Sequence, residues 1–244
     1  MKYMGSKSRI AKHIVPIIQK YINDNGIKNY YEPFVGGANI IDKVKCKSKY
    51  GSDMQEYLIE IYKNLDKINT LPDFVTREHY TEIKKCYNEK LDTYPKWYIG
   101  SVGFLASYNG KFFDGGYAGI VYTQAGTIRN YYDEAKRNLQ TQIPNLTNIK
   151  WGCIDYSLSN DNIKNWLVYC DIPYKDTTQY GICKNFDNDK FWNWARKLSK
   201  NNIVLISECQ APNDFESIWE QEVTRTVNNS SRNKSIEKLF VYKG

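Results

Sequence analysis

The chain has 244 residues, of which 41% are hydrophobic and 25% are charged. This composition suffices for one large globular domain, or for a domain with a modest insertion. The longest apolar runs fall far short of the roughly 18 residues that a membrane-spanning helix requires, and no apolar stretch follows the N-terminal charges, so we expect neither a membrane span nor a signal peptide. The net charge of +7 suits a polyanionic partner, and the 21 tyrosines are suited to stacking on planar rings.

The six cysteines are scattered, and no two of them form a Cys-x-x-Cys pair. The two histidines, His13 and His79, complete no cluster of the kind that binds a metal. Buried free thiols are typical of proteins in a reducing cytoplasm. We therefore expect a cytoplasmic protein that binds no metal.

The chain begins with a helical pattern followed by a strand. Isoleucines at helical spacing predict a helix over residues 10–22, which Pro16 should bend or shorten. Residues 30–34 form a predicted strand that ends in a loop, and the turn Val35-Gly36-Gly37 follows it. A strand that runs into a glycine turn is a frequent start of an α/β sheet.

The next elements repeat this alternation. A helix is expected to begin at residues 40–44, and a second short strand at 49–52 ends at Asp53. Residues 57–65 are helical by periodicity. The order strand, glycine turn, helix, strand, acid and helix predicts a parallel α/β sheet.

The middle of the chain has a different pattern. Two helical segments, 76–91 and 96–108, precede a loop at 108–119 that is rich in glycine and aromatic residues. Loops of this length without regular structure are usually functional or disordered. We interpret residues 66–130 as an inserted, mostly helical module.

After the insertion, the alternation of helix and strand resumes. Helices are predicted at 133–141 and 189–199, strands at 149–153, 167–170 and 203–207, and a terminal hairpin of 223–227 with 238–242. The predicted fold class is therefore α/β, with one sheet interrupted by the insertion.

The segment Glu32–Gly37 lies where the first strand turns into a helix. Glycines allow a ligand to approach the backbone closely, and a helix N-terminus favours a negative group. Asp53 follows at the spacing at which doubly wound folds place an acid for ribose hydroxyls. An ordinary turn and a helix N-cap at Asp53 are the alternative interpretations.

The segment Lys2–Lys7 precedes the first helix. One interpretation is a capped helix start, with Ser6 or Ser8 as the cap. The other is a lid over a ligand, in which Tyr3 stacks and Lys7 pairs with a carboxylate.

Two motifs follow later strands. Asp171-Ile172-Pro173-Tyr174 comes directly after the apolar run 166–170, and Asp155-Tyr156 comes after the strand at 149–153. An acid at the mouth of a buried strand is well placed for chemistry, and the proline and tyrosine beside it suit the exocyclic amine of a planar base. Ser207-Glu208 ends a further strand and could be only a polar pair at the sheet edge.

Taken in chain order, these motifs resemble those of the Dam-type (α-group) DNA adenine N6-methyltransferases, and the resemblance extends through nearly the whole chain. The chain looks most like phage-encoded or orphan members. The resemblance implies a Rossmann-like S-adenosylmethionine-dependent methyltransferase sheet. It also implies a catalytic domain of residues 1–65 and 131–244, a target-recognition insertion at 66–130, and a bacterial or phage-infected cytoplasm as the location.

The resemblance assigns roles residue by residue. The residues expected to bind S-adenosylmethionine are Tyr3, Lys7, Phe34, Gly36, Gly37, Asp53, Asp155, Tyr156 and Asp171. The catalytic residues would be Asp171, Ile172, Pro173 and Tyr174, with no metal involved. The residues expected to contact double-stranded DNA are Asn109, Lys111, Arg129 and Tyr180. The sequence predicts no particular oligomeric state and no target sequence.

One residue departs from the family pattern, because Ile172 stands where proline is usual. The position has to supply a backbone carbonyl, which isoleucine also has, so only the rigidity of proline is lost. Two alternatives stay open: a cytosine N4-methyltransferase, and an inactive relative that only binds DNA. Asp171 favours adenine over cytosine, since cytosine amino-methyltransferases commonly carry serine there.

Overall fold

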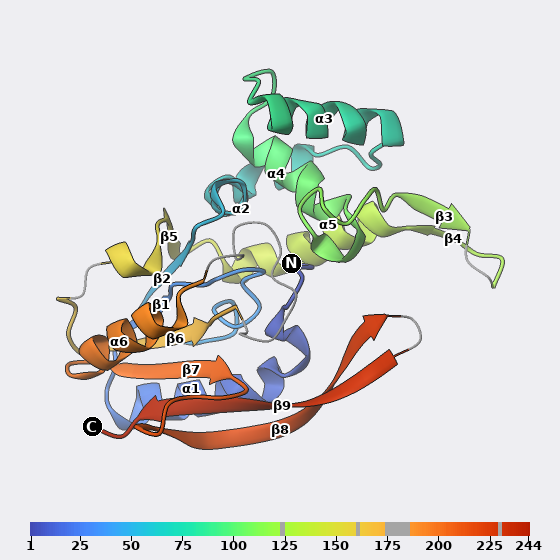
Figure 1. Cartoon of the computed structure of the whole chain (residues 1–244). Coiled ribbons are helices and arrows are strands. Elements are labelled where there is room, and N and C mark those ends of the chain that lie inside the picture. The colour runs from blue at the N-terminus through green and yellow to red at the C-terminus, as the bar shows by residue number, and fades with distance from the viewer. Residues whose placement is uncertain (123–124, 160–161, 174–185, 229–230) are drawn as a thin grey trace. The chain divides into compact units, whose positions relative to one another are not determined.

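The computed structural model describes residues 1–122, 125–159, 162–173, 186–228 and 231–244. The chain divides into two compact units (Figure 1). The first comprises Met1–Lys12, Gly36–Lys43 and Gln55–Cys153. The second comprises His13–Val35, Val44–Met54 and Ile154–Gly244.

The second unit is built on a mixed sheet. Its strands are β1 (Asn29–Glu32), β2 (Ser48–Asp53), β6 (Trp166–Asp171), β7 (Ile203–Glu208), β8 (Phe215–Asn228) and β9 (Ser231–Tyr242), and they lie in the order β2-β1-β6-β7-β9-β8. The four strands β2, β1, β6 and β7 are parallel to one another, whereas β9 is antiparallel to both β7 and β8. This arrangement confirms the predicted α/β fold with a mostly parallel sheet.

The parallel strands β1, β6 and β7 are short and mostly buried on both faces. In β6, the four residues Leu167–Cys170 are all buried, as expected for a strand with helices on both sides of its sheet. Helix α1 (Ala11–Asp24) buries Ile14 and Ile18, and helix α6 (Asn188–Ser199) buries Phe191. The apolar runs that predicted these strands are therefore core residues.

The first unit is mostly helical. Its main elements are α2 (Glu56–Lys63), α3 (Arg77–Glu89), α4 (Lys96–Leu105), α5 (Tyr131–Gln142), the short strands β3 (Ile120–Tyr122), β4 (Ile128–Asn130) and β5 (Ile149–Cys153), and the 3-10 turns η1 (Lys7–Arg9), η2 (Leu65–Thr70), η3 (Tyr108–Gly110) and η4 (Ile143–Asn145). Helix α4 packs against α2, α3 and α5, which explains why it is apolar on all sides. The predicted insertion at 66–130 lies within this unit.

The expected helix at 40–44 is wrong, because the segment forms turns. Its apolar residues are buried, but Ala38 before it has a left-handed φ of 54°. The side-chain amide of Gln142 donates to the Ala38 carbonyl at 2.8 Å and to Asp42 Oδ2 at 2.9 Å. A side chain from a distant helix thus donates a hydrogen bond to the Ala38 carbonyl, which a backbone N–H would satisfy in a helix.

The terminal hairpin was predicted with strands that are too short. Both predicted segments belong to it, but β8 has 14 residues and β9 has 12. In the observed register Val223 pairs with Ser235, and Tyr242 pairs with Phe215, so the two segments are offset along the hairpin.

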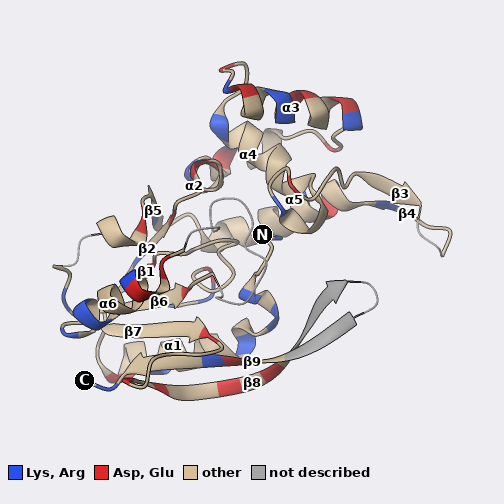
Figure 2. Cartoon of the chain, viewed as in Figure 1, with Lys and Arg blue, Asp and Glu red and all other residues tan. Residues whose placement is uncertain are grey.

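Charged residues of both signs are interspersed on the surface. Along α3, for example, Lys and Arg alternate with Glu (Figure 2). Within the described ranges, no helix is long and apolar enough to cross a membrane. The same residues include no group of three His, Cys, Asp or Glu side chains that could hold a metal ion.

Candidate active site

Four acids end the four parallel strands of the second unit. Along the sheet order they are Asp53 on β2, Glu32 on β1, Asp171 on β6 and Glu208 on β7. Parallel strands have their carboxyl ends at the same edge, and neighbouring strands lie about 4.8 Å apart. The register, which pairs Asp171 with Ser207, places Asp171 level with the end of β7. This edge therefore concentrates negative charge and favours a cationic ligand.

Glu32 was named in the sequence analysis only as the first residue of the segment Glu32–Gly37, and no role was assigned to it. Its side chain is 2% exposed, and the hydroxyl of Tyr30 donates to its Oε1 at 2.6 Å. Burial raises the pKa of Tyr30 well above its ordinary value, so this phenol stays protonated and acts as the donor. The sequence feature that could have identified it is Pro33, which cannot continue a central strand and therefore marks Glu32 as the last strand residue.

Aromatic rings from distant parts of the second unit meet in one cluster. Phe34, Tyr156, Phe186 and Phe191 are all in mutual contact, with ring centroids between 5.2 and 5.9 Å apart. The shortest of these distances joins Phe34 and Tyr156, the two rings that the resemblance assigns to the cofactor. The structure thus brings these two predicted residues together.

Tyr156 contributes an aromatic ring to the site, and its phenol does not act as an acid. Its ring is 5% exposed, and burial, with the nearby Asp155 and Asp187 carboxylates, raises the pKa of its phenol to about 12. The hydroxyl is therefore neutral at physiological pH. The ring can contribute only packing and hydrogen bonding to a ligand.

Asp53 and Asp155 belong to two segments that are far apart in the sequence but adjacent in space. The backbone N–H of Ile154 donates to the Asp53 carbonyl at 3.2 Å, which ties the end of β2 to the start of the Asp155-Tyr156 motif. Asp155 also caps the 3-10 turn η5 (Tyr156–Leu158), since its Oδ1 accepts from the Ser157 N–H at 2.7 Å. This cap fixes the carboxylate at one oxygen.

The predicted catalytic motif begins at the end of β6. Asp171 is the last residue of that strand and is partly exposed. Ile172 is 2% exposed and belongs to the same core cluster as Tyr156 and Phe191. An apolar side chain is therefore required at this position, and isoleucine provides it as proline would. Tyr174 and Tyr180 lie outside the described residues.

Cys170 precedes the motif and could be considered as a nucleophile. It is fully buried, and burial together with the carboxylates of Glu32 and Asp171 raises the pKa of its thiol well above the ordinary value. A thiolate at this position is disfavoured. Cys170 is a core residue.

In the first unit, the glycine turn packs against the N-terminal segment. Gly36 has a φ of +45°, and a Cβ placed on it would lie 3.1 Å from Cε1 of Tyr3. A Cβ on Gly37 would lie 2.8 Å from Cβ of Tyr3. Close approach therefore favours glycine at position 37, and the left-handed φ favours it at position 36, where the Tyr3 ring is also near.

Lys7 and the helix start fit the capping interpretation in part. Ser6 accepts a hydrogen bond from the Ser8 N–H at 3.2 Å and so caps η1. Lys7 itself is 6% exposed, which is unusual for a lysine that has only a surface role.

The predicted DNA-contact residues lie in different settings. Asn109 is exposed and has a φ of +57° within η3, and Lys111 is partly exposed just after it. Arg129 on β4 pairs with Glu134 through two hydrogen bonds, of 2.6 and 2.8 Å, and lies 4.6 Å from the ring centroid of Tyr131. Glu134 therefore competes with any phosphate for Arg129.

The β3–β4 hairpin is a feature that the sequence analysis missed. It exposes four large apolar side chains, namely Ile120, Val121, Tyr122 and Ile128. Tyr122 is 81% exposed and Ile128 is 64% exposed. Exposed apolar groups gathered on one short element commonly mark a binding surface.

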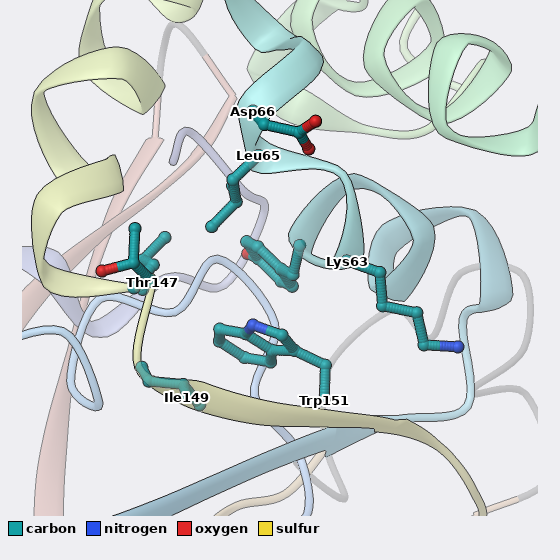
Figure 3. Close-up of a pocket in the computed structure, with 8 residues that line it drawn as sticks. Lys63, Leu65, Asp66, Thr147, Ile149 and Trp151 are labelled. Carbon is teal, nitrogen blue, oxygen red and sulfur yellow. The ribbon is translucent and has the colours of Figure 1, made fainter.

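A surface pocket of about 300 Å³ lies in the first unit, between α2 and the segment that leads into β5 (Figure 3). Trp151 points into it from β5, and the other lining residues are Tyr62, Lys63, Leu65, Asp66, Leu146, Thr147 and Ile149. None of the residues predicted from the sequence lines this pocket.

Two solved structures are similar to this chain at a low level. The crystal structure of SMU.472, assigned as a methyltransferase and complexed with SAH, aligns with a TM-score of 0.40 at 10% identity over 100% of this chain and 54% of that chain. A structure from Thermoplasma acidophilum, also assigned as a methyltransferase, aligns with a TM-score of 0.26 at 9% identity, over 46% of this chain and 54% of that chain. The chain spans about half the length of each.

Sequence relatives are more informative. Among curated proteins, the type II methyltransferase M.MjaIII of Methanocaldococcus jannaschii is 26% identical over 238 residues, which cover 84% of this chain and 82% of that protein. The family described as D12 class N6 adenine-specific DNA methyltransferase matches residues 3–227. Because this match extends over nearly the whole chain and agrees with the order of the motifs, the chain belongs to the D12 class N6 adenine-specific DNA methyltransferases.

Proposed function

We propose that Asp171 and the backbone carbonyl of Ile172 each accept one N–H bond from the exocyclic amine of the target adenine. The lone pair of that amine is delocalised into the purine ring, which makes the nitrogen a poor nucleophile. Two acceptors on the N–H groups draw the nitrogen toward tetrahedral geometry and concentrate its lone pair. The observation that carries this proposal is the position of Asp171, at the carboxyl end of a buried parallel strand in a family of adenine methyltransferases.

S-adenosylmethionine is the cofactor, and it supplies a methyl group that its sulfonium has already activated. The chemistry of the residues in the second unit fits this group. The carboxylates that end β1, β2, β6 and β7 suit its positive charges, and the Phe34–Tyr156 pair suits its adenine ring. Asp53 would accept from the ribose hydroxyls.

The glycine turn also fits a cofactor. Gly36 and Gly37 present backbone without a Cβ, and the ring of Tyr3 packs against them. We assign Tyr3, Lys7, Gly36 and Gly37 to the cofactor as well. The enzyme's contribution in this scheme is positioning and electrostatics, and no metal is required.

The DNA substrate is proposed to be double-stranded, with the target adenine turned out of the helix so that N6 reaches Asp171. Tyr174 would stack on this base and Tyr180 would lie beside it. Recognition is assigned to residues 66–130, where Asn109 and Lys111 are exposed or partly exposed polar groups. The apolar hairpin β3–β4 lies in the same segment and is the strongest candidate there for contact with unstacked bases. We propose that the protein acts in the bacterial or phage-infected cytoplasm, where such a substrate is found.

The test is the transfer of labelled methyl from S-adenosylmethionine to unmethylated duplex DNA, followed by digestion and separation of the nucleosides. We expect the label on N6-methyladenine. Label on N4 of cytosine would show that the base assignment is wrong. Cofactor and DNA binding without any transfer would identify an inactive relative that only binds DNA.

A further inference from the structure

We infer that Tyr62 is a positioning residue for the cofactor: its hydroxyl fixes the Gly36 carbonyl and thereby sets the direction of the Gly37 N–H. The inference rests on the proposed role of the glycine turn in binding S-adenosylmethionine. Tyr62 is on α2, outside every motif that the sequence analysis identified.

The central contact is one hydrogen bond. The Tyr62 hydroxyl donates to the carbonyl oxygen of Gly36 at 2.6 Å. Both residues belong to the first unit, and Tyr62 is 2% exposed whereas Gly36 is half-buried, so the bond is partly shielded from water. A backbone carbonyl that accepts a hydrogen bond from a buried hydroxyl is held more firmly than a carbonyl that accepts only from water.

The Gly36 carbonyl and the Gly37 N–H belong to the same peptide group. Because a trans peptide is planar, the two bonds point in opposite directions and rotate together. Holding the oxygen toward Tyr62 therefore aims the Gly37 N–H away from Tyr62. Gly36 has a φ of +45°, and the ring of Tyr3 lies against the turn. Because glycine restricts the backbone little, the peptide group between Gly36 and Gly37 could adopt several orientations, and the hydrogen bond from Tyr62 selects one of them.

Tyr62 is itself held by a second ring. Trp151 on β5 stacks on it, with centroids 4.5 Å apart and an angle of 23° between the planes. Figure 3 shows Trp151 at the floor of the pocket beside Lys63 and Ile149. This stacking holds the tyrosine side chain in place, so its hydroxyl oxygen stays beside the Gly36 carbonyl.

The test is Tyr62→Phe, which removes only the hydroxyl and keeps the stacked ring. We expect the dissociation constants of S-adenosylmethionine and S-adenosylhomocysteine, measured by calorimetry, to rise about fivefold. A change of this size corresponds to the net free energy of one hydrogen bond of ordinary strength. At saturating cofactor we expect kcat and the KM for DNA to stay near those of the wild type, because Tyr62 touches no reacting group.

Tyr132→Phe is the matched control. Tyr132 is a fully buried tyrosine of the same unit, and its hydroxyl has no hydrogen-bond partner among the described residues. Its removal should leave cofactor affinity unchanged. A Tyr62→Phe protein that binds the cofactor as the wild type does would overturn the inference, whatever its melting temperature.

A second readout is independent of activity. The chain has 15 glycines, so a spectrum of protein labelled with ¹⁵N-glycine resolves few amide signals. In the absence of cofactor, Tyr62→Phe should shift the Gly37 amide signal, and Tyr132→Phe should not. An unmoved Gly37 signal would also overturn the inference. If the wild type itself bound no S-adenosylmethionine, the proposed function would fail instead, which is a distinguishable result.

Discussion

Phe34 and Tyr156 are far apart in the chain, yet their rings pack with centroids 5.2 Å apart in the second unit. Phe34 follows the first strand and Tyr156 follows β5, so the contact joins two of the motifs that carried the family resemblance. Two rings in contact at the edge of a parallel sheet form a wall that suits a purine. This pair therefore supports the cofactor assignment better than either residue does alone.

The raised pKa of the Tyr156 phenol predicts that the stability of the protein depends on pH in the alkaline range. Burial raises its pKa from 10.0 to about 12, so the folded state favours the neutral form. The resulting stabilisation is fully present below pH 10 and is lost as pH rises through 12. Tyr156→Phe keeps the ring without the ionising group. The midpoint of urea unfolding is measured for both proteins at pH 8, 10 and 12. We expect the two midpoints to be similar at pH 8, and the midpoint of the variant to fall less than that of the wild type between pH 10 and 12.

Asp171 is predicted to be essential for transfer. Asp171→Ala removes one of the two acceptors for the amine, and we expect kcat to fall by roughly 10²–10³-fold, the range measured for loss of one preorganised hydrogen-bonding group. DNA affinity, measured by fluorescence anisotropy, should stay close to that of the wild type. Asp189→Asn changes an exposed acid in the first turn of α6 and is the control. A variant at Asp171 that transfers methyl at the wild-type rate would contradict the mechanism.

Gly36 gives a test of the glycine turn. Gly36→Ala adds a Cβ that meets the Tyr3 ring at 3.1 Å and strains a φ of +45°. We expect the KM for S-adenosylmethionine to rise about tenfold, since strain of 1–2 kcal/mol must be accommodated by moving the turn. Gly26→Ala is the matched control, because Gly26 has a φ of +60° and no neighbour within 4 Å of the added Cβ. It should lose stability but keep the cofactor KM, and equal effects at both glycines would refute the assignment.

The sequence was a good guide wherever a segment's own residues decide its structure. The buried strands β6 and β7 are short runs of branched and aromatic residues, and their positions were predicted within one residue at each end. Asp171 was identified for the same reason, since an acid directly after such a run has a definite place in a parallel sheet. These features depend on local pattern and on strand order alone.

Other features depend on residues distant in the chain. The segment 40–44 forms turns, and Gln142 hydrogen-bonds the Ala38 carbonyl just before it, a contact that no local pattern encodes. Tyr62 looks like an ordinary core residue of an amphipathic helix until its hydroxyl is found on Gly36. The β3–β4 hairpin was missed because its strands have only three residues each and expose their apolar side chains.

That hairpin is predicted to contact DNA. The double substitution Tyr122→Ser and Ile128→Ser removes its two most exposed apolar groups. We expect DNA affinity to fall at least tenfold, since stacking on a base contributes about 1–3 kcal/mol, while cofactor affinity and melting temperature stay unchanged. Leu158→Ser is the control, because Leu158 is also highly exposed, at 74%, but lies in the second unit. If the double variant binds DNA as the wild type does, the hairpin does not contribute to DNA binding, and other parts of the insertion must carry recognition.

Ile172 separates the role of a side chain from the role of a backbone carbonyl. The side chain is 2% exposed within an aromatic and aliphatic core, so Ile172→Ala should cost about 2–5 kcal/mol of unfolding free energy, measured in urea. Ile236→Ala, at an isoleucine of β9 that is 49% exposed, should cost far less. Ile172→Pro restores the usual family residue and keeps the carbonyl, so methyl transfer should persist at a rate within about tenfold of the wild type. If the proline variant folds and binds cofactor and DNA but transfers no methyl, the backbone carbonyl at position 172 is not sufficient, and the isoleucine side chain or its backbone N–H is needed as well.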